Sequence, residues 1–494
     1  MRSDPGFRLR RRPQNRRGRR GLRGGRPVWA ISAVGAVGVL ALGLGSPFAW
    51  RIAEHVEDSK LPSVSARAPL LGRLSSWIED PPVSRQRFAQ ARERGERIDP
   101  SSVPRLVEWL DPLAGSFHWR AEPSPSIDAG FADAGALRVE YSLDEVLTEK
   151  VFEILRRGRV ERGLAIVLDP RSGRLLAYVA TDPDALPPEG IYPAASIVKI
   201  LTAATLLEEA PEEARSGCVY RGNKYRLHSR RLGRPASGRN ATLEEALATS
   251  NNQCFSQWAV HVLGEEKLRA TFERFGWLDA PAPGHIAGRI KTISTKLELG
   301  RLGSGLAGIE VNPLHIASLA SVLTKGLLIE PWWIDRIVDS RGRSLALPRR
   351  PEARRVLSQS VADHLRSMLI ATTKKGTAKR AFRTRRGRAS LPGIDVAGKT
   401  GNVTGGEPFG RYEWFLGLAP AEAPTIAVVV LQVQSNLWWS RSSELAAKIL
   451  HTVFCEGERC QAGLADRFTG DLGASIAPLL ISELERQPQI ARVH

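Results

Sequence analysis

The amino-acid sequence predicts an α+β domain, and three consecutive patterns support this fold class. Apolar residues recur at helical spacing between Ser142 and Gly158. Two short apolar runs, 164–169 and 174–179, follow on either side of turn residues and predict a β-hairpin. A second helical pattern begins at Ser196. A helix, a hairpin and a second helix in this order are typical of an α+β domain.

The elements of this domain are predicted from their local patterns. Ser142 followed by Glu145 predicts a capping box at the start of the first helix. A later amphipathic helix starts at Val311-Asn312-Pro313, and its lone histidine, His315, is interpreted as structural. The other predicted elements are helices at 242–250, 255–263 and 443–454 and strands at 394–401, 413–418 and 425–433, the last of them central in its sheet.

The net charge of the chain is concentrated at its N-terminus. The 494 residues carry +19, and residues 1–26 alone carry +10, because they contain eleven arginines and one acid, Asp4. A basic chain of this kind raises nucleic acid as a partner. We interpret the arm at 1–27 instead as a topology signal that contacts lipid head groups, and we expect no nucleic-acid partner.

A transmembrane anchor is predicted at residues 28–50. This run contains no charged side chain and is long enough to span a bilayer. Arginines precede it, so the positive-inside rule places the N-terminus in the cytoplasm and the residues after the anchor on the periplasmic or extracellular side. A cleaved signal peptide is the alternative. Residues 51–137 alternate amphipathic pieces with Pro- and Ser-rich stretches and are predicted to form a stalk or small pedestal.

Ser196 and Lys199 are the first candidate catalytic residues. On a helix, positions i and i+3 share a face, so the lysine amine would lie over the serine hydroxyl. A serine hydroxyl becomes a good nucleophile when a nearby base takes its proton, and a desolvated lysine can be that base. S-x-x-K is common by chance, so this pair gains weight only from further motifs.

Two further motifs follow in the sequence. Ser250-Asn251-Asn252 places a hydroxyl and a carboxamide between two helical segments, where they would relay a proton and bind a substrate carbonyl. Lys399-Thr400-Gly401 lies on a predicted strand edge, where the lysine charge and the threonine hydroxyl would bind a substrate carboxylate and the glycine would permit close approach. The order S-x-x-K, S-x-N, K-T-G is the set known from penicillin-binding proteins and serine β-lactamases.

On these motifs, residues 138–455 resemble the transpeptidase domain of monofunctional, class B-like penicillin-binding proteins. The surroundings agree, since Gly376-Thr377-Ala378 resembles the G-T-A upstream of K-T-G and 414–420 resembles the strand after it. The resemblance implies a central antiparallel sheet flanked by helices, an all-helical subdomain, and a C-terminal tail at 456–494. No phosphate-binding loop or metal-ligand spacing occurs, so we expect neither a cofactor nor a metal.

The resemblance also implies a role for each motif residue. Ser196 would form the acyl-enzyme, Lys199 would be its general base, and Ser250 would shuttle the proton. Asn252 would hold the substrate amide, Lys399, Thr400 and Gly401 would bind the substrate terminus, and backbone N–H groups of Ser196 and Asn402 would form the oxyanion hole. Asn402 stands where the family more often has Thr or Ser, which affects only the expected substrate preference.

The implied function is peptidoglycan D,D-transpeptidation outside the cytoplasmic membrane, with stem peptides as substrates and β-lactams as covalent inhibitors. Alternatives are a D,D-carboxypeptidase or endopeptidase of the same mechanism, and a catalytically silent β-lactam sensor. A β-lactamase is disfavoured, because an anchor and stalk suit a wall-facing enzyme. Cell-wall synthesis proteins are further candidate partners.

The four cysteines are predicted to form two disulfides, because all lie on the external side. Three pairings are possible, and the sequence alone does not choose among them. Cys455 and Cys460 enclose a short loop, so we expect them to pair locally and to leave Cys218 with Cys254. The alternative is that Cys254 is a small buried apolar residue.

Overall fold

The computed structural model describes residues 105–110, 137–282, 285–338, 344–345, 350–434 and 439–470. The predicted arm and anchor, most of the predicted stalk, and the tail beyond residue 470 lie outside these ranges. Within the described part of the chain, no helix is both long and apolar enough to cross a membrane.

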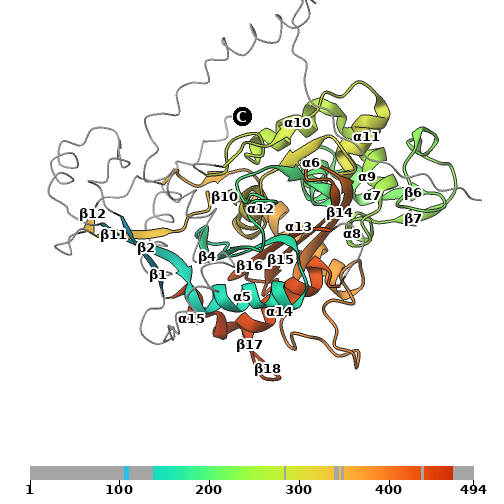
Figure 1. The fold of residues 1–494 in the computed structure, drawn as a ribbon. Coiled ribbons are helices and arrows are strands. Elements are labelled where there is room, and N and C mark those ends of the chain that lie inside the picture. Colours follow the sequence, from blue (N-terminus) through green and yellow to red (C-terminus); the bar gives the residue numbers. More distant parts are fainter. Residues whose placement is uncertain are drawn as a thin grey trace, which may run out of the picture. The chain divides into compact units, whose positions relative to one another are not determined.

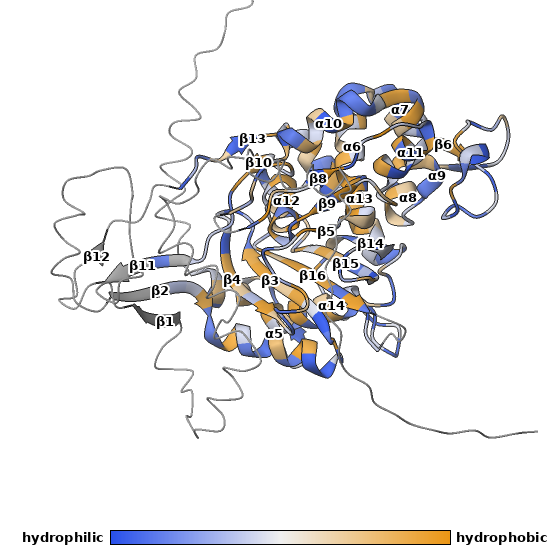
Figure 2. Ribbon diagram, turned by 45° about the horizontal axis from the view of Figure 1, so that its top comes forward, coloured by the Kyte–Doolittle hydropathy of each residue, from blue (hydrophilic) through white to orange (hydrophobic). Residues whose placement is uncertain are grey.

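The core of the domain is a five-stranded antiparallel sheet (Figure 1). Its order is β14 (Ala397–Gly405), β15 (Gly410–Ala419), β16 (Ile426–Gln434), β3 (Arg162–Asp169) and β4 (Arg174–Ala180). Every residue of β16 and β4 is buried, and Figure 2 shows the hydrophobic colouring of β3 and β16. The structure therefore confirms the predicted hairpin and the central position of the 425–433 strand.

Helices cover both faces of this sheet. α5 (Glu145–Arg157) packs against α14 (Ser442–Phe454) on one face, and α12 (Pro313–Lys325) contacts β15 and β16 from the other (Figure 1). The ends of α5 and α14 agree with the sequence prediction to within three residues. His315 on α12 is buried, and its two ring nitrogens bond the Asn312 N–H and the Asp279 carbonyl, which confirms its structural role.

A group of helices beside the sheet corresponds to the helical subdomain that the resemblance implies. α6 (Val198–Glu209) contacts most of its neighbours in this group. The other members are α7 (Pro211–Ser216), α8 (Leu243–Ala248), α9 (Asn252–Trp258), α10 (Gly264–Arg274), α11 (Lys296–Ser304) and α13 (Gln359–Lys374). Short paired strands connect them: β5 (Tyr192–Pro193), β8 (Arg289–Ile290) and β9 (Ile309–Val311), β6 (Cys218–Tyr220) with β7 (Arg239–Ala241), and β10 (Leu327–Leu328) with β13 (Arg354–Arg355).

The predicted capping box at Ser142 is wrong. The helix begins later, and its N-cap is Asp144, whose carboxylate accepts the Leu147 N–H at 2.7 Å. Ser142 lies in strand β2 (Leu137–Asp144), where its N–H bonds the Trp333 carbonyl and its hydroxyl donates to the Leu175 carbonyl. These pairings hold Ser142 in an extended backbone, so its hydroxyl cannot cap the helix.

Strand pairing continues across the predicted boundary at residue 137. β1 (Arg105–Leu110), which falls in the predicted stalk, pairs with β2, and β2 pairs with β11 (Ile334–Val338). β12 (Ser344–Leu345) completes this second antiparallel sheet. At the other end, the hairpin of β17 (Cys455–Glu456) and β18 (Arg459–Cys460) and the short helix α15 (Asp466–Thr469) continue beyond the predicted end of the domain.

The structure contains both predicted disulfides. Cys218 on β6 is bonded to Cys254 on α9, with 5.5 Å between their Cα atoms, and Cys455 is bonded to Cys460. The first bond joins the β6–β7 hairpin to the helix that carries Asn252. The second closes the hairpin of β17 and β18.

Peptide mapping without reduction should therefore recover Cys218–Cys254 and Cys455–Cys460. In the chain-entropy model, the 36-residue separation of the first pair corresponds to about 4 kcal/mol of stability and the 5-residue separation of the second to about 2 kcal/mol. Reduction should lower the melting temperature and slow acylation, whereas the double variant Cys455→Ser, Cys460→Ser should lower only the melting temperature. Free thiols at Cys218 and Cys254 would contradict the pairing.

Candidate active site

Ser196 lies in a tight 3-10 turn, Ala195–Ile197, that leads directly into α6. Its hydroxyl accepts a hydrogen bond from the Lys199 amine at 2.8 Å, which confirms the predicted i, i+3 contact. Ala195 has a left-handed φ of 49°, and Gly305 packs against its carbonyl so closely that a Cβ there would lie 1.9 Å from the oxygen. This packing holds the turn that presents Ser196.

Lys199 is completely buried and has no carboxylate partner among the described residues. Its amine donates to Ser196 Oγ, to Asn252 Oδ1 at 2.8 Å and to the Ser304 carbonyl. Burial, with a further contribution from the charge of Lys399, holds the pKa of Lys199 well below its ordinary value. The lowered pKa favours the unprotonated amine, which is the form that can accept the proton of Ser196.

Ser250 and Asn252 lie at the junction of α8 and α9. Ser250 has a left-handed φ of 53°, and its hydroxyl accepts a hydrogen bond from the Lys399 amine at 3.1 Å. Asn252 is the first residue of α9, and its amide Nδ2 donates to the Tyr225 carbonyl at 2.8 Å. Both polar atoms of the Asn252 side chain are thus engaged within the protein, where the sequence predicted a contact to substrate.

The K-T-G motif forms the start of edge strand β14. Lys399 is completely buried, its amine donates to Ser250 Oγ and to the Thr400 carbonyl at 2.7 Å, and burial lowers its pKa to about 7. A Cβ at Gly401 would lie 3.2 Å from the Ala195 Cβ, so this glycine also permits close packing of β14 on the Ser196 turn. Asn402 Oδ1 accepts a hydrogen bond from Arg411 Nε at 3.0 Å.

All three predicted motifs therefore meet at one site. The Lys199 amine connects the first motif to Asn252 of the second, and the Lys399 amine connects the second to the third.

Sequence analysis missed two groups that complete the site. The Ser304 carbonyl accepts from Lys199, and its place between two glycines, Gly303 and Gly305, is the only signal that the sequence offers. The Thr377 hydroxyl shares a 2.6 Å hydrogen bond with the Thr400 hydroxyl, and the Thr377 N–H donates to the Ala248 carbonyl. The sequence identifies Thr377 only as part of the G-T-A resemblance, which assigns it no role.

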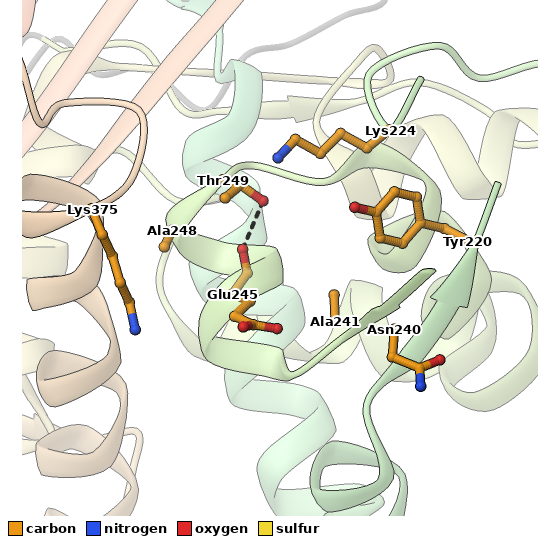
Figure 3. Close-up of a pocket in the computed structure, with 8 residues that line it drawn as sticks. All are labelled: Tyr220, Lys224, Asn240, Ala241, Glu245, Ala248, Thr249 and Lys375. Carbon is orange, nitrogen blue, oxygen red and sulfur yellow. Dashed lines mark hydrogen bonds between the residues drawn. The ribbon is translucent and has the colours of Figure 1, made fainter. Parts of the chain in front are cut away.

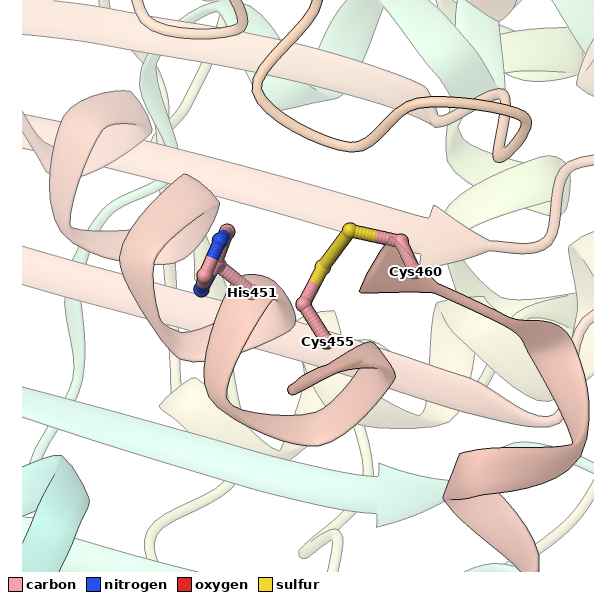
Figure 4. Close-up of side chains that lie close together, drawn as sticks. All are labelled: His451, Cys455 and Cys460. Carbon is pink, nitrogen blue, oxygen red and sulfur yellow. A yellow bond between two sulfur atoms is a disulfide. The ribbon is translucent and has the colours of Figure 1, made fainter. Parts of the chain in front are cut away.

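One group of potential metal ligands lies outside this site in the described residues. His451, Cys455 and Cys460 have ligand atoms within 4.8 Å of one another at the end of α14. The two sulfurs are bonded to each other (Figure 4), so neither is available as a thiolate.

The fold has a five-stranded antiparallel sheet, and a Ser–Lys pair lies beside it. Comparison with known proteins identifies the family to which this fold and site belong. The penicillin-binding protein transpeptidase domain model matches residues 163–454. The chain belongs to the penicillin-binding protein transpeptidase family.

The sequence identity between the chain and its individual relatives is low. The chain is 25% identical over 314 residues to peptidoglycan D,D-transpeptidase PbpA of Mycobacterium tuberculosis, and 24% identical over 319 residues to PbpA of Mycolicibacterium smegmatis. Each match covers 55% of this chain and 61% of the relative, so the chain spans less than two thirds of the relatives' length. The M. tuberculosis penicillin-binding protein A, solved as an imipenem acyl-enzyme complex, has a similar fold, with a TM-score of 0.52, 22% identity and coverage of 66% of this chain and 82% of that chain.

The two buried lysines predict a distinctive pH dependence of β-lactam acylation. Below the lowered pKa of Lys199 the amine is protonated and cannot act as base, so the rate should fall at low pH. Above about pH 7 the free enzyme loses the Lys399 charge that would attract the substrate carboxylate, so the second-order rate constant should also fall.

The saturated acylation rate should hold to higher pH, because a bound carboxylate raises the pKa of Lys399. Stopped-flow acylation between about pH 5 and 11 measures both constants, because this range includes the lowered pKa of Lys399, about 7, and the ordinary lysine pKa, about 10.4. In Lys399→Arg the charge persists, so the alkaline fall of the second-order constant should disappear. An unchanged profile in this variant would assign the alkaline limb to another group.

Proposed function

We propose that this chain is a serine D,D-transpeptidase that cross-links peptidoglycan stem peptides through an acyl-enzyme on Ser196. The observation that carries the proposal is the Lys199 amine, which is buried, depressed in pKa, free of any carboxylate partner in the described residues, and 2.8 Å from the Ser196 hydroxyl. The relatives named peptidoglycan D,D-transpeptidase support it, although they match this chain over 61% of their length.

In the proposed acylation step, Lys199 takes the hydroxyl proton as Ser196 Oγ attacks the carbonyl of the terminal D-alanyl–D-alanine bond. Backbone N–H groups of Ser196 and Asn402 would stabilise the oxyanion. Ser250 Oγ accepts a hydrogen bond from the Lys399 amine, and its hydroxyl would pass a proton to the leaving amine as the peptide bond breaks. Free D-alanine leaves, and the remaining peptide is esterified to Ser196.

In the second step, an amine of another stem peptide attacks the ester, and its proton returns through the same groups as Ser196 Oγ leaves. The new amide bond is the cross-link. Lys399 and Thr400 would hold the terminal carboxylate during the first step. Thr377 would orient the Thr400 hydroxyl, since the two hydroxyls are 2.6 Å apart.

Two other functions of the same site are distinguished by their products. A carboxypeptidase or endopeptidase would transfer the acyl group to water or hydrolyse an existing cross-link. A silent β-lactam sensor would form the acyl-enzyme with penicillin and turn over no peptide. The intact Lys199 and Lys399 hydrogen bonds favour a working catalyst over a sensor.

The proposed location is the outer face of the cytoplasmic membrane, with residues 28–50 as a single-pass anchor. This part of the proposal rests on the uncharged run and on the arginines before it. Stem peptides, β-lactams and the bilayer would be its partners, together with other cell-wall synthesis proteins.

Ser196→Ala should abolish covalent labelling by a fluorescent penicillin, because it removes the hydroxyl that the Lys199 amine contacts. Lys199→Ala should slow labelling by several orders of magnitude, because the serine would have no base within reach. Ser318→Ala is the matched control, since that buried hydroxyl bonds only its own helix, at the Leu314 carbonyl, and it should label normally. Normal labelling of Ser196→Ala would refute the nucleophile.

Turnover of a pentapeptide with and without an amine acceptor then separates transpeptidation from hydrolysis. A cross-linked product supports the proposal, hydrolysis alone supports the carboxypeptidase, and the absence of both in a protein that labels with penicillin supports the sensor.

The topology is tested with reporters fused after residue 60. A reporter that is active only after export should be active there, and one that requires the cytoplasm should be inactive. The reverse result would place the catalytic domain in the cytoplasm and rule out peptidoglycan as its substrate.

A further inference from the structure

Two strongly basic segments flank the Ser250 side of the active site. The basic hairpin, residues 218–241, comprises β6, β7 and the loop between them, and it contains seven Lys or Arg residues and no acid. The basic turn, residues 374–388, begins at the last residue of α13 and leads toward β14. It contains eight Lys or Arg residues and no acid. The N-terminal arm, the basic hairpin and the basic turn together carry a net charge of +25. The whole chain carries +19, so all its other residues together have a net charge of −6.

Most of the fifteen charges in the basic hairpin and the basic turn have no carboxylate partner among the residues that the structure describes. Three of them form ion pairs: Arg234 with Glu213, Lys374 with Asp395, and Lys375 with Glu244. The other twelve make no ion pair with any residue that the structure describes: Arg221, Lys224, Arg226, Arg230, Arg231, Arg239, Lys379, Arg380, Arg383, Arg385, Arg386 and Arg388.

Both segments are fixed to the backbone on either side of Ser250. The N–H groups of Asn252 and Gln253 donate to the Lys224 carbonyl, and the Gln253 side chain donates to the carbonyls of Arg221 and Asn223. The Cys218–Cys254 disulfide adds a covalent tie. On the other side, the Thr377 N–H donates to the Ala248 carbonyl. The basic segments are therefore held in place beside the catalytic motif.

A cavity of about 280 Å³ lies between the two segments. One lysine comes from each segment, Lys224 from the basic hairpin and Lys375 from the basic turn, and Thr249, next to Ser250, lines the cavity with them. Figure 3 shows the Lys224 amine directed toward Thr249, with Lys375 on the other side of Ala248. The carboxylate of Glu245 also lines the cavity, but it accepts the Thr242 N–H as the capping box of α8.

Lys224 lines this cavity without an ion-pair partner among the described residues. It is half-buried and lies 5.5 Å from the ring of Tyr225, which is 49% exposed. Burial and the charge of Arg239 lower the pKa of Lys224, and an anion in the cavity would offset both effects. Lys375 has less need of an added anion, because it already forms an ion pair with Glu244 at 2.7 Å.

We propose that this cavity is a carboxylate subsite of the active site, in which Lys224 binds a carboxylate of the peptide substrate other than the one held by Lys399. The identity of the ligand rests on the proposed function. The chemistry of the subsite rests on the cavity, the unpaired lysine and the surrounding positive charge. The carboxylate could belong to the peptide that acylates Ser196 or to the acceptor peptide, and the experiment separates these two sources.

Binding is measured first, without turnover, by fluorescence anisotropy on the full chain. The probes are two labelled stem peptides that lack the terminal D-alanines and differ only in a free internal carboxylate or its primary amide. Wild type should bind the carboxylate probe at least about tenfold more tightly than the amide, as expected for a charge-assisted hydrogen bond. Lys224→Gln should remove this difference, and Lys224→Arg should retain most of it.

Arg230→Gln is the matched control, because it removes the same charge from an exposed position of the basic hairpin that does not line the cavity. It should keep the preference for the carboxylate probe. Equal binding of both probes by wild type would overturn the proposal. An equal loss in Arg230→Gln and Lys224→Gln would also overturn it, because the effect would then come from the general surface charge.

Steady-state kinetics with matched carboxylate and amide peptides then identify the source. Lys224→Gln should raise KM for the carboxylate form of the donor, of the acceptor, or of both, and leave kcat and penicillin labelling unchanged. Unchanged KM values for both peptides would overturn the subsite. Loss of penicillin labelling in wild type would instead count against the proposed function, and the binding assay would still test the subsite.

Discussion

The site depends on the burial of two lysines, Lys199 and Lys399. Taking a single ammonium out of water costs several kcal/mol even after the protein relaxes, and Lys199 and Lys399 are both completely inaccessible to solvent. No described carboxylate neutralises either of them, and their hydrogen bonds go to hydroxyls, a carboxamide and backbone carbonyls. The protein therefore stabilises two amines that readily give up their protons, and this property is what a proton-transfer site requires.

The surrounding fold can be understood as the means of holding these amines. Ser304 at the end of α11 and Asn252 at the start of α9 supply acceptors to Lys199, while edge strand β14 places Lys399 against Ser250. Each acceptor comes from a different element. The disulfide, the capping of α9 by Asn251 and the tight packing of Gly305 and Gly401 on Ala195 keep those elements at fixed separations. A shift of one element would remove an acceptor from a buried donor.

The sequence predicted the parts of this structure that local chemistry determines. The helix ending at Gly158, the 164–179 hairpin and the Ser196–Lys199 contact follow from periodicity, turn residues and helical spacing. The motif residues were identified by resemblance, and their hydrogen bonds confirm that they share one site. The capping box at Ser142 failed because β2 pairs with Trp333, almost 200 residues later, and no local pattern reports such a partner. The contributions of Ser304 and Thr377 were missed for the same reason.

The distribution of charge adds a second level of organisation to the site. As the proposed base, Lys199 would act without a charge, and Lys399 loses its charge above about pH 7, so the two buried lysines would attract an anionic substrate only weakly above neutral pH. The basic hairpin and basic turn carry most of their Lys and Arg side chains at positions exposed to water, outside the buried site. Their positive potential would raise the local concentration of an anionic peptide and speed its association, without adding a permanent charge to the buried site. Proton transfer and long-range attraction are thereby assigned to different residues, and each group can have the pKa that its task requires.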